Sequence, residues 1–180
     1  MIDTKETPSQ TAGPYVHIGC LPEIAGLERR QLGSGFGAIL SDAADAIDLE
    51  ITVFDGAGEP VRDAMVEIWQ AGPDGRFDSK GFQNWGRAAT DLDSVLYRFR
   101  TLKPAALDGQ APHILVWIVA RGINLGLTTR IYFPEDDHGT DPVMTLAGDR
   151  AATLVAQATP SGYRHVIHLQ GSEETVFFDV

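Results

Sequence analysis

The sequence has little cysteine and little positive charge. Cys20 is the only thiol in 180 residues, which excludes an internal disulfide framework and any metal or redox site built from paired cysteines. The 14 Lys and Arg residues stand against 25 Asp and Glu residues, so the net charge is −11. Because no stripe of Lys or Arg forms, nucleic acid and anionic membrane surfaces are poor candidate partners, and a small ligand or a protein is the better expectation.

Long apolar runs are also missing. The run Ile114–Ala120 ends at Arg121, far short of the roughly 20 apolar residues that span a bilayer. Residues 1–10 carry neither the basic nor the apolar region of a secretion signal. Together with the single thiol, this favours a soluble, cytoplasmic protein.

Glycine and proline, by contrast, punctuate the whole chain. The 19 Gly and 10 Pro residues fall between short runs rich in β-formers, a spacing typical of an all-β protein. We expect one domain over residues 1–180, whose first 46 residues form an irregular N-terminal arm. The predicted strands are Leu49–Phe54, Val61–Trp69, Leu96–Arg100, Ile114–Ala120, Thr128–Phe133, Tyr163–Leu169 and Thr175–Phe178.

The first two of these strands carry a turn signal between them. Asp55–Pro60 supplies the Asp and Gly residues of a tight reversal, so the flanking runs are predicted to pair as a hairpin. Helix formers gather in Asp149–Ala158, where we expect one short helix. The prolines at positions 8, 14 and 22 argue against helix or central strand in the N-terminal arm, and Leu32–Ala46 is predicted to be a variable loop.

The five histidines do not form an evident metal site. His165 and His168 fall on opposite faces of a strand, because side chains alternate with a period of two. His138 lies in an acidic stretch that is typical of a solvated loop. His113 opens an apolar strand, where a lone histidine is usually a core residue. From the residues alone, the interpretation ends at a soluble β protein.

A set of motifs goes further. The segment Val66–Phe77 reads VEIWQAGPDGRF and is similar to the intradiol ring-cleavage dioxygenases, in which a strand ending in E-x-W-Q-A leads into a turn. Further matches follow in order at Trp85–Arg87, Thr101–Pro104, Ala111–Ile114 and Thr129–Phe133. The resemblance covers most of residues 47–180. It implies a two-sheet β-sandwich of the intradiol dioxygenase type, with an irregular N-terminal arm and one short helix.

The resemblance also implies a non-haem Fe(III) held by two tyrosines and two histidines. Phe77 stands where the first tyrosine would fall, and residues 105–112 contain no second one. The H-x-H of catalytic chains reads His113-Ile114-Leu115 here, so His113 is the only retained ligand. We therefore expect this chain to bind no metal and to be inactive alone.

The ends of the chain resemble one subunit type in this family. Thr7–Gly19 and Gly171–Asp179 are similar to the alpha subunits of its two-subunit branch, which cleaves protocatechuate with O2 to 3-carboxy-cis,cis-muconate. There, the alpha subunit pairs with a beta subunit that carries the Fe(III), and it closes part of the substrate pocket. Mapped by motif, the implied substrate-binding residues are Thr11, Gly13, Pro14, Tyr15 and Arg130. Arginine suits the carboxylate of such a substrate.

Two other functions remain open. A metal-free β-sandwich binding module would explain the missing ligands, but it gives no reason for the motifs at both ends of the chain. A self-contained intradiol dioxygenase acting on catechol would fit the family, but Phe77, Leu115 and the absent second tyrosine weigh against it.

Overall fold

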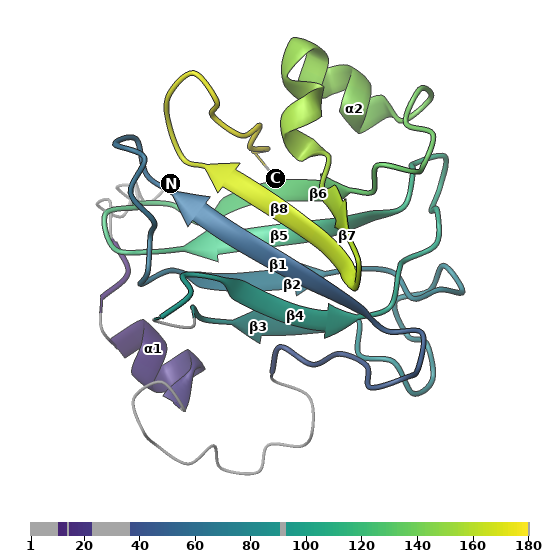
Figure 1. The fold of residues 1–180 in the computed structure, drawn as a ribbon, viewed down its shortest axis with the longest axis horizontal. Coiled ribbons are helices and arrows are strands. Elements are labelled where there is room, and N and C mark those ends of the chain that lie inside the picture. Colours follow the sequence, from purple (N-terminus) through teal and green to yellow (C-terminus); the bar gives the residue numbers. More distant parts are fainter. Residues whose placement is uncertain (1–10, 14, 23–36, 91–92, 180) are drawn as a thin grey trace, which may run out of the picture.

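Two four-stranded sheets pack face to face in the computed structural model, which describes residues 11–13, 15–22, 37–90 and 93–179 (Figure 1). The strands are β1 (Ile47–Phe54), β2 (Met65–Trp69), β3 (Trp85–Ala88), β4 (Tyr97–Thr101), β5 (His113–Val119), β6 (Leu127–Tyr132), β7 (Gln157–Thr159) and β8 (Gly162–His168). Sheet A has the order β4-β1-β8-β7, and sheet B has the order β3-β2-β5-β6. The predicted all-β sandwich of two sheets is confirmed.

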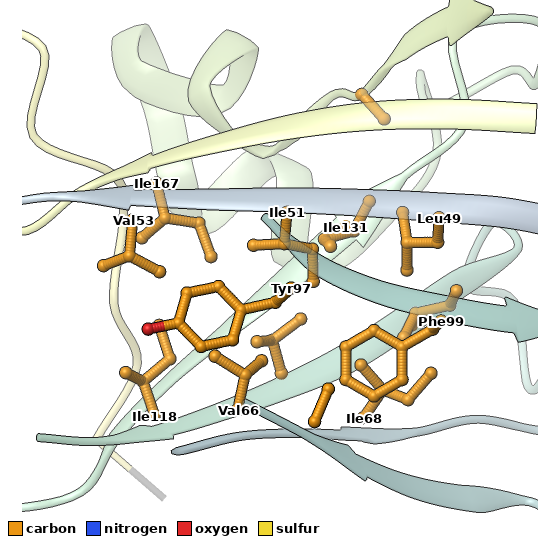
Figure 2. Packing of buried hydrophobic residues seen from close by; sticks show 14 of the residues in the cluster. Leu49, Ile51, Val53, Val66, Ile68, Tyr97, Phe99, Ile118, Ile131 and Ile167 are labelled. Carbon is orange, nitrogen blue, oxygen red and sulfur yellow. The ribbon is translucent and has the colours of Figure 1, made fainter. Parts of the chain in front are cut away.

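The core lies between the two sheets. Figure 2 shows Ile51 and Val53 of β1 pointing toward Val66 and Ile118 of sheet B, with the ring of Tyr97 between them. All five side chains are fully buried. Because inward-facing positions alternate along each strand, both sheets contribute apolar side chains to this layer, and its burial is the main source of stability.

The predicted hairpin between Leu49–Phe54 and Val61–Trp69 forms only at its turn, where Phe54 and Pro60 make an isolated antiparallel bridge and the Val61 N–H donates to the Val53 carbonyl. The turn itself forms, since the Asp55 carboxylate accepts hydrogen bonds from the backbone N–H of Ala57 and Glu59. However, β1 pairs with β4 and β8 in sheet A, whereas β2 pairs with β3 and β5 in sheet B. The chain therefore crosses between the sheets after Val61. A turn motif specifies a local reversal, but it does not specify which strands pair afterwards.

The buried hydroxyl of Tyr97 stabilises this crossover. Its oxygen donates to the Val61 carbonyl at 2.8 Å and accepts from the Ala64 N–H at 3.2 Å. Burial raises the pKa of the phenol, so the hydroxyl stays protonated and able to donate. A strand of sheet A thus holds the segment that leads into sheet B.

Two short strands were missed, and one predicted strand does not form. The strands β3 and β7 have only four and three residues, too few to show an alternating pattern. Residues 175–178, predicted as a strand, make only an isolated bridge from Phe178 to Thr128. The other predicted strands form within a few residues of their expected limits.

The predicted helix at Asp149–Ala158 is only partly correct. Helix α2 spans Pro142–Ala147 and continues as a 3-10 helix, η2, over Gly148–Leu154, while residues 157–158 belong to β7. The start is set by Asp141, whose carboxylate accepts hydrogen bonds from the N–H groups of Val143 and Met144. This Asp-Pro pair is a standard helix-start signal that the prediction did not use.

The N-terminal arm also differs from its prediction. Helix α1 spans Tyr15–Cys20, although no helix was expected there. One short turn of helix fits between Pro14 and Pro22 because first-turn residues need no intrahelical N–H bond. The predicted variable loop lies partly outside the described residues. Its described end is fixed to β4, because the Leu40 N–H donates to the Arg100 carbonyl and the Leu40 side chain is buried.

Among the described residues, no helix has the length and apolar character needed to cross a membrane.

Candidate functional site

The outer face of sheet B brings the sequence-predicted positions together. In β5, Ile114, Val116 and Ile118 point into the core, so His113, Leu115 and Trp117 point to the outer face. The register of β5 with β6 places His113 opposite Tyr132 and Leu115 opposite Arg130. Two of the positions at which the family carries iron ligands therefore lie beside Arg130 on one surface.

His113 is largely buried at the start of β5. Its Nδ1 lies 2.8 Å from the Ala111 carbonyl oxygen, a bond that requires the proton on Nδ1. The ring packs against Tyr132 with centroids 5.6 Å apart. Burial lowers the pKa of His113, and the nearby positive charge of Arg130 lowers it further. The imidazole is therefore neutral near pH 7.

Arg130 projects from the edge strand β6. Its Nη1 donates to Gln110 Oε1 at 2.5 Å and to Tyr132 Oη at 3.2 Å. Desolvation raises the pKa of Tyr132, so this phenol is neutral at physiological pH. Both partners of the guanidinium are therefore neutral groups, which leave its charge in place.

A cleft of about 460 Å³ opens next to Arg130, between β6, helix α2 with η2, and the C-terminal segment 176–179. Figure 1 shows α2 and the C-terminal end on the same side of the sandwich as β6. Leu115, Leu146, Val176 and Phe178 give the cleft apolar walls. Arg130 and Arg150 add two cations to the lining, and Asp179 adds one carboxylate. Apolar walls with an excess of positive charge suit an apolar ligand that carries a negative charge.

The residues at the family's ligand positions do not fit Fe(III). Leu115 and Phe77 have no donor atom, and the Phe77 ring is exposed and lies apart from the residues that line the cleft. Within the described ranges, no group of three or more His, Cys, Asp or Glu side chains could hold a metal ion. His113 alone offers one nitrogen, which is too few for a hard trivalent ion.

The predicted N-terminal residues lie elsewhere. The Thr11 hydroxyl accepts a hydrogen bond from the Gly122 N–H at 2.7 Å, in the loop before β6. Arg130 is the fourth residue of that strand, and its hydrogen bonds go to Gln110 and Tyr132. The Tyr15 ring is 80% exposed, and Gly13 accepts a backbone hydrogen bond from Val16. Pro14 lies outside the described residues.

Sequence reasoning missed two members of the site, Gln110 and Tyr132. Tyr132 lies inside the Thr129–Phe133 motif, but a buried aromatic in a strand is usually read as core. The Asp108-Gly109 pair before Gln110 is a turn signal that the prediction did not use.

Comparisons with known proteins show the family to which the chain belongs. Residues 41–171 match the family model described as Dioxygenase. The chain is 39% identical to a protocatechuate 3,4-dioxygenase alpha chain of Pseudomonas putida, covering 97% of this chain and 96% of the relative. It belongs to the intradiol ring-cleavage dioxygenases.

Further members of the intradiol dioxygenase family are similar over different extents. An alpha chain of the same enzyme in Burkholderia cepacia is 37% identical over the full length of both chains. The beta chain from that organism is 32% identical over 68% of this chain and 63% of its own. A dioxygenase domain from Streptomyces sp. SirexAA-E shares the fold, with a TM-score of 0.57 at 20% identity over 92% of this chain and 94% of that structure.

Proposed function

We propose that this chain is the iron-free alpha subunit of a protocatechuate 3,4-dioxygenase. One observation carries the proposal: a chain with full-length similarity to alpha chains has apolar side chains at Phe77 and Leu115, where the family places iron ligands. Catalysis would then use Fe(III) in a separate beta subunit. The beta chain of the Burkholderia cepacia enzyme is similar to this chain. Residues 1–180 would form one cytoplasmic domain, with residues 1–46 as its N-terminal arm.

When held by the partner, Fe(III) would supply the activation of the ring toward O2, with the two catechol oxygens as its chelating ligands. The role of this chain is to bind and orient the substrate. The N-terminal residues Thr11, Gly13, Pro14 and Tyr15 would form part of the wall of the partner's pocket. The 80% exposure of Tyr15 supports this role, because an aromatic ring so open is available for contact with a partner.

Arg130 would pair with the substrate carboxylate. An arginine in a partly apolar cleft forms strong charge-assisted hydrogen bonds to a carboxylate, because two parallel N–H groups match its two oxygens. Plain catechol has no such group. The proposal therefore predicts that Arg130 sets the preference for protocatechuate over catechol.

Reconstitution tests which of the two chains binds the iron and whether both chains are needed for ring cleavage. The isolated chain should carry no stoichiometric iron by elemental analysis and should cleave neither substrate. Mixed with a beta-type chain that has both tyrosines and the H-x-H pair, it should give an active, iron-containing complex. About one tightly bound iron per isolated chain would refute the proposal.

The variant Arg130→Ala tests the carboxylate contact. A charge-assisted hydrogen bond contributes roughly 1.5–3 kcal/mol, so kcat/KM for protocatechuate should fall about 10- to 100-fold. The value for catechol should stay unchanged. Arg164→Ala is the matched control, because Arg164 is half-exposed on β8 of the opposite sheet and pairs with Glu50. A wild-type kcat/KM for protocatechuate in Arg130→Ala would remove Arg130 from the substrate site.

A further inference from the structure

The side chain that contacts Arg130 comes from a tight turn. Leu107 and Gln110 exchange two backbone hydrogen bonds, of 3.2 and 2.9 Å. Between them, Asp108 and Gly109 have φ values of 50° and 75°, as the two central residues of a type I′ turn require. Glycine adopts this conformation without strain, and aspartate tolerates it. The turn therefore places Gln110 at a defined position beside β6.

Gln110 and Tyr132 together use both hydrogens of one guanidinium nitrogen. Arg130 Nη1 donates to Gln110 Oε1 and to Tyr132 Oη. In the described part of the chain, Nε and Nη2 have no hydrogen-bond partner. Three N–H donors therefore remain for a ligand. Their fork can bind both oxygens of one carboxylate.

Arg130 differs from most other arginines of this protein, because its hydrogen-bond partners Gln110 and Tyr132 are neutral. Seven other arginines lie within 4.0 Å of a carboxylate: Arg76, Arg87, Arg98, Arg100, Arg121, Arg150 and Arg164. Arg130 has no such partner among the residues that the structure describes. The Asp141 carboxylate lies one side chain further away: it is hydrogen-bonded to the Tyr132 hydroxyl, and it accepts from the N–H groups of Ala111 and Val143. An arginine with no carboxylate within 4.0 Å in the described part of the chain keeps its N–H donors available for the carboxylate of a ligand.

We propose that Gln110 is a positioning residue that holds Arg130 in the cleft without placing a carboxylate directly on its guanidinium, so that the site selects an aromatic ring with a carboxylate over a neutral ring. This inference rests on the proposed role of Arg130 in binding substrate. Glutamine suits the task because its amide oxygen fixes the guanidinium without cancelling its charge. Glutamate would fit the same space but would itself occupy the arginine as an ion pair.

The decisive variant is therefore Gln110→Glu in the complex of this chain with its iron-bearing partner. We expect kcat/KM for protocatechuate to fall at least 10-fold, through KM with little change in kcat, and the value for catechol to stay within 2-fold. A second readout needs no turnover. The dissociation constant of 4-hydroxybenzoate, which has the carboxylate but only one hydroxyl, should rise at least 10-fold in calorimetric titration.

Two further variants separate charge from structure. Methionine has a length similar to that of glutamine but no strong acceptor atom. Gln110→Met should therefore lower the ratio of kcat/KM for protocatechuate to kcat/KM for catechol, but by less than Gln110→Glu does. Gln157→Glu is the matched control, because Gln157 is exposed on β7 of the opposite sheet and receives the same change of charge. It should behave as wild type in both measurements.

The outcomes distinguish this inference from the function on which it rests. If Arg130→Ala loses the preference for protocatechuate while Gln110→Glu keeps it and binds 4-hydroxybenzoate normally, the positioning role is overturned and the role of Arg130 stands. If both variants behave as wild type, both assignments are wrong. If Gln110→Glu does not assemble with the partner, an unchanged preference in Gln110→Met overturns the positioning role.

Discussion

The two faces of sheet B use the same strands for different purposes. On the inner face, Ile68, Ile114 and Ile118 are fully buried against sheet A. On the outer face, the alternate positions of the same strands carry Glu67 and Leu115. Core positions accept many apolar residues of suitable volume, whereas the outer face depends on particular atoms. Substitutions on the inner face should therefore have the larger effect on stability, and substitutions beside Arg130 on the outer face should change function.

The largest effect is expected for Ile68→Ala. The side chain is buried between the sheets (Figure 2), so its loss leaves a cavity and should lower the free energy of unfolding by about 4 kcal/mol. Urea unfolding followed by circular dichroism measures this change. Ile39→Ala is the control, because Ile39 is 64% exposed and its loss should cost less than about 0.5 kcal/mol. A changed preference for protocatechuate in folded Ile68→Ala would break the comparison between the faces.

Acid should act on the core through His165. Its ring is buried, its Nε2 has no partner among the described residues, and burial lowers its pKa to about 4. In the unfolded chain, the imidazole of His165 takes up a proton near pH 6.5, whereas in the folded chain it does so only near pH 4. The free energy of unfolding therefore has its full value above pH 6.5 and falls as the pH is lowered from 6.5 to 4. The loss should be roughly 3 kcal/mol over that range.

Unfolding titrations across this pH range test the prediction against His165→Leu, which has no titratable group at this position. The variant should show a shallower loss of stability between pH 6.5 and 4 than the wild type. Equal slopes for both proteins would show that His165 accepts a proton in the folded state.

The ion pair on the outer face gives a smaller effect. Arg87 pairs with Glu67, and both side chains are mostly buried, at 19% and 9% exposure. Glu67→Ala leaves the guanidinium without its carboxylate and should cost about 2 kcal/mol, between the values for exposed and buried pairs. Asp78→Ala is the control, since the Arg76–Asp78 pair is 63% and 73% exposed and should contribute almost nothing. Equal effects in the two variants, measured by thermal unfolding, would contradict this ranking.

Several elements could be predicted from the sequence because their signals are local. The apolar run that marks β5 lies within seven residues, and its prediction differs from the structure by one residue at each end. Strand β3 could not be found in this way, because four residues are too few to establish a period. The helix start at Asp141-Pro142 was available in the sequence and was simply not used.

For the site, too, local motifs identified some residues, whereas long-range contacts determined the others. The resemblance implied roles for His113, Leu115 and Arg130, and it implied that Arg130 and the N-terminal residues Thr11 and Gly13 face one substrate pocket of the partner. The fold adds the neighbours of Arg130, which are Gln110 and Tyr132. The bond between Arg130 and Gln110 joins residues 20 positions apart, and no local pattern contains it.

By itself, the sequence determined the β character of the chain, most of its strands and the absence of donor atoms at Phe77 and Leu115, because these depend only on residue type and short-range pattern. Only the tertiary structure decided that β1 and β2 join different sheets and that the hydrogen-bond partners of Arg130 are Gln110 and Tyr132. Strand pairing and the partners of a charged side chain depend on contacts between distant segments. These contacts form, and contribute to stability, only after the chain has closed the loops between the segments.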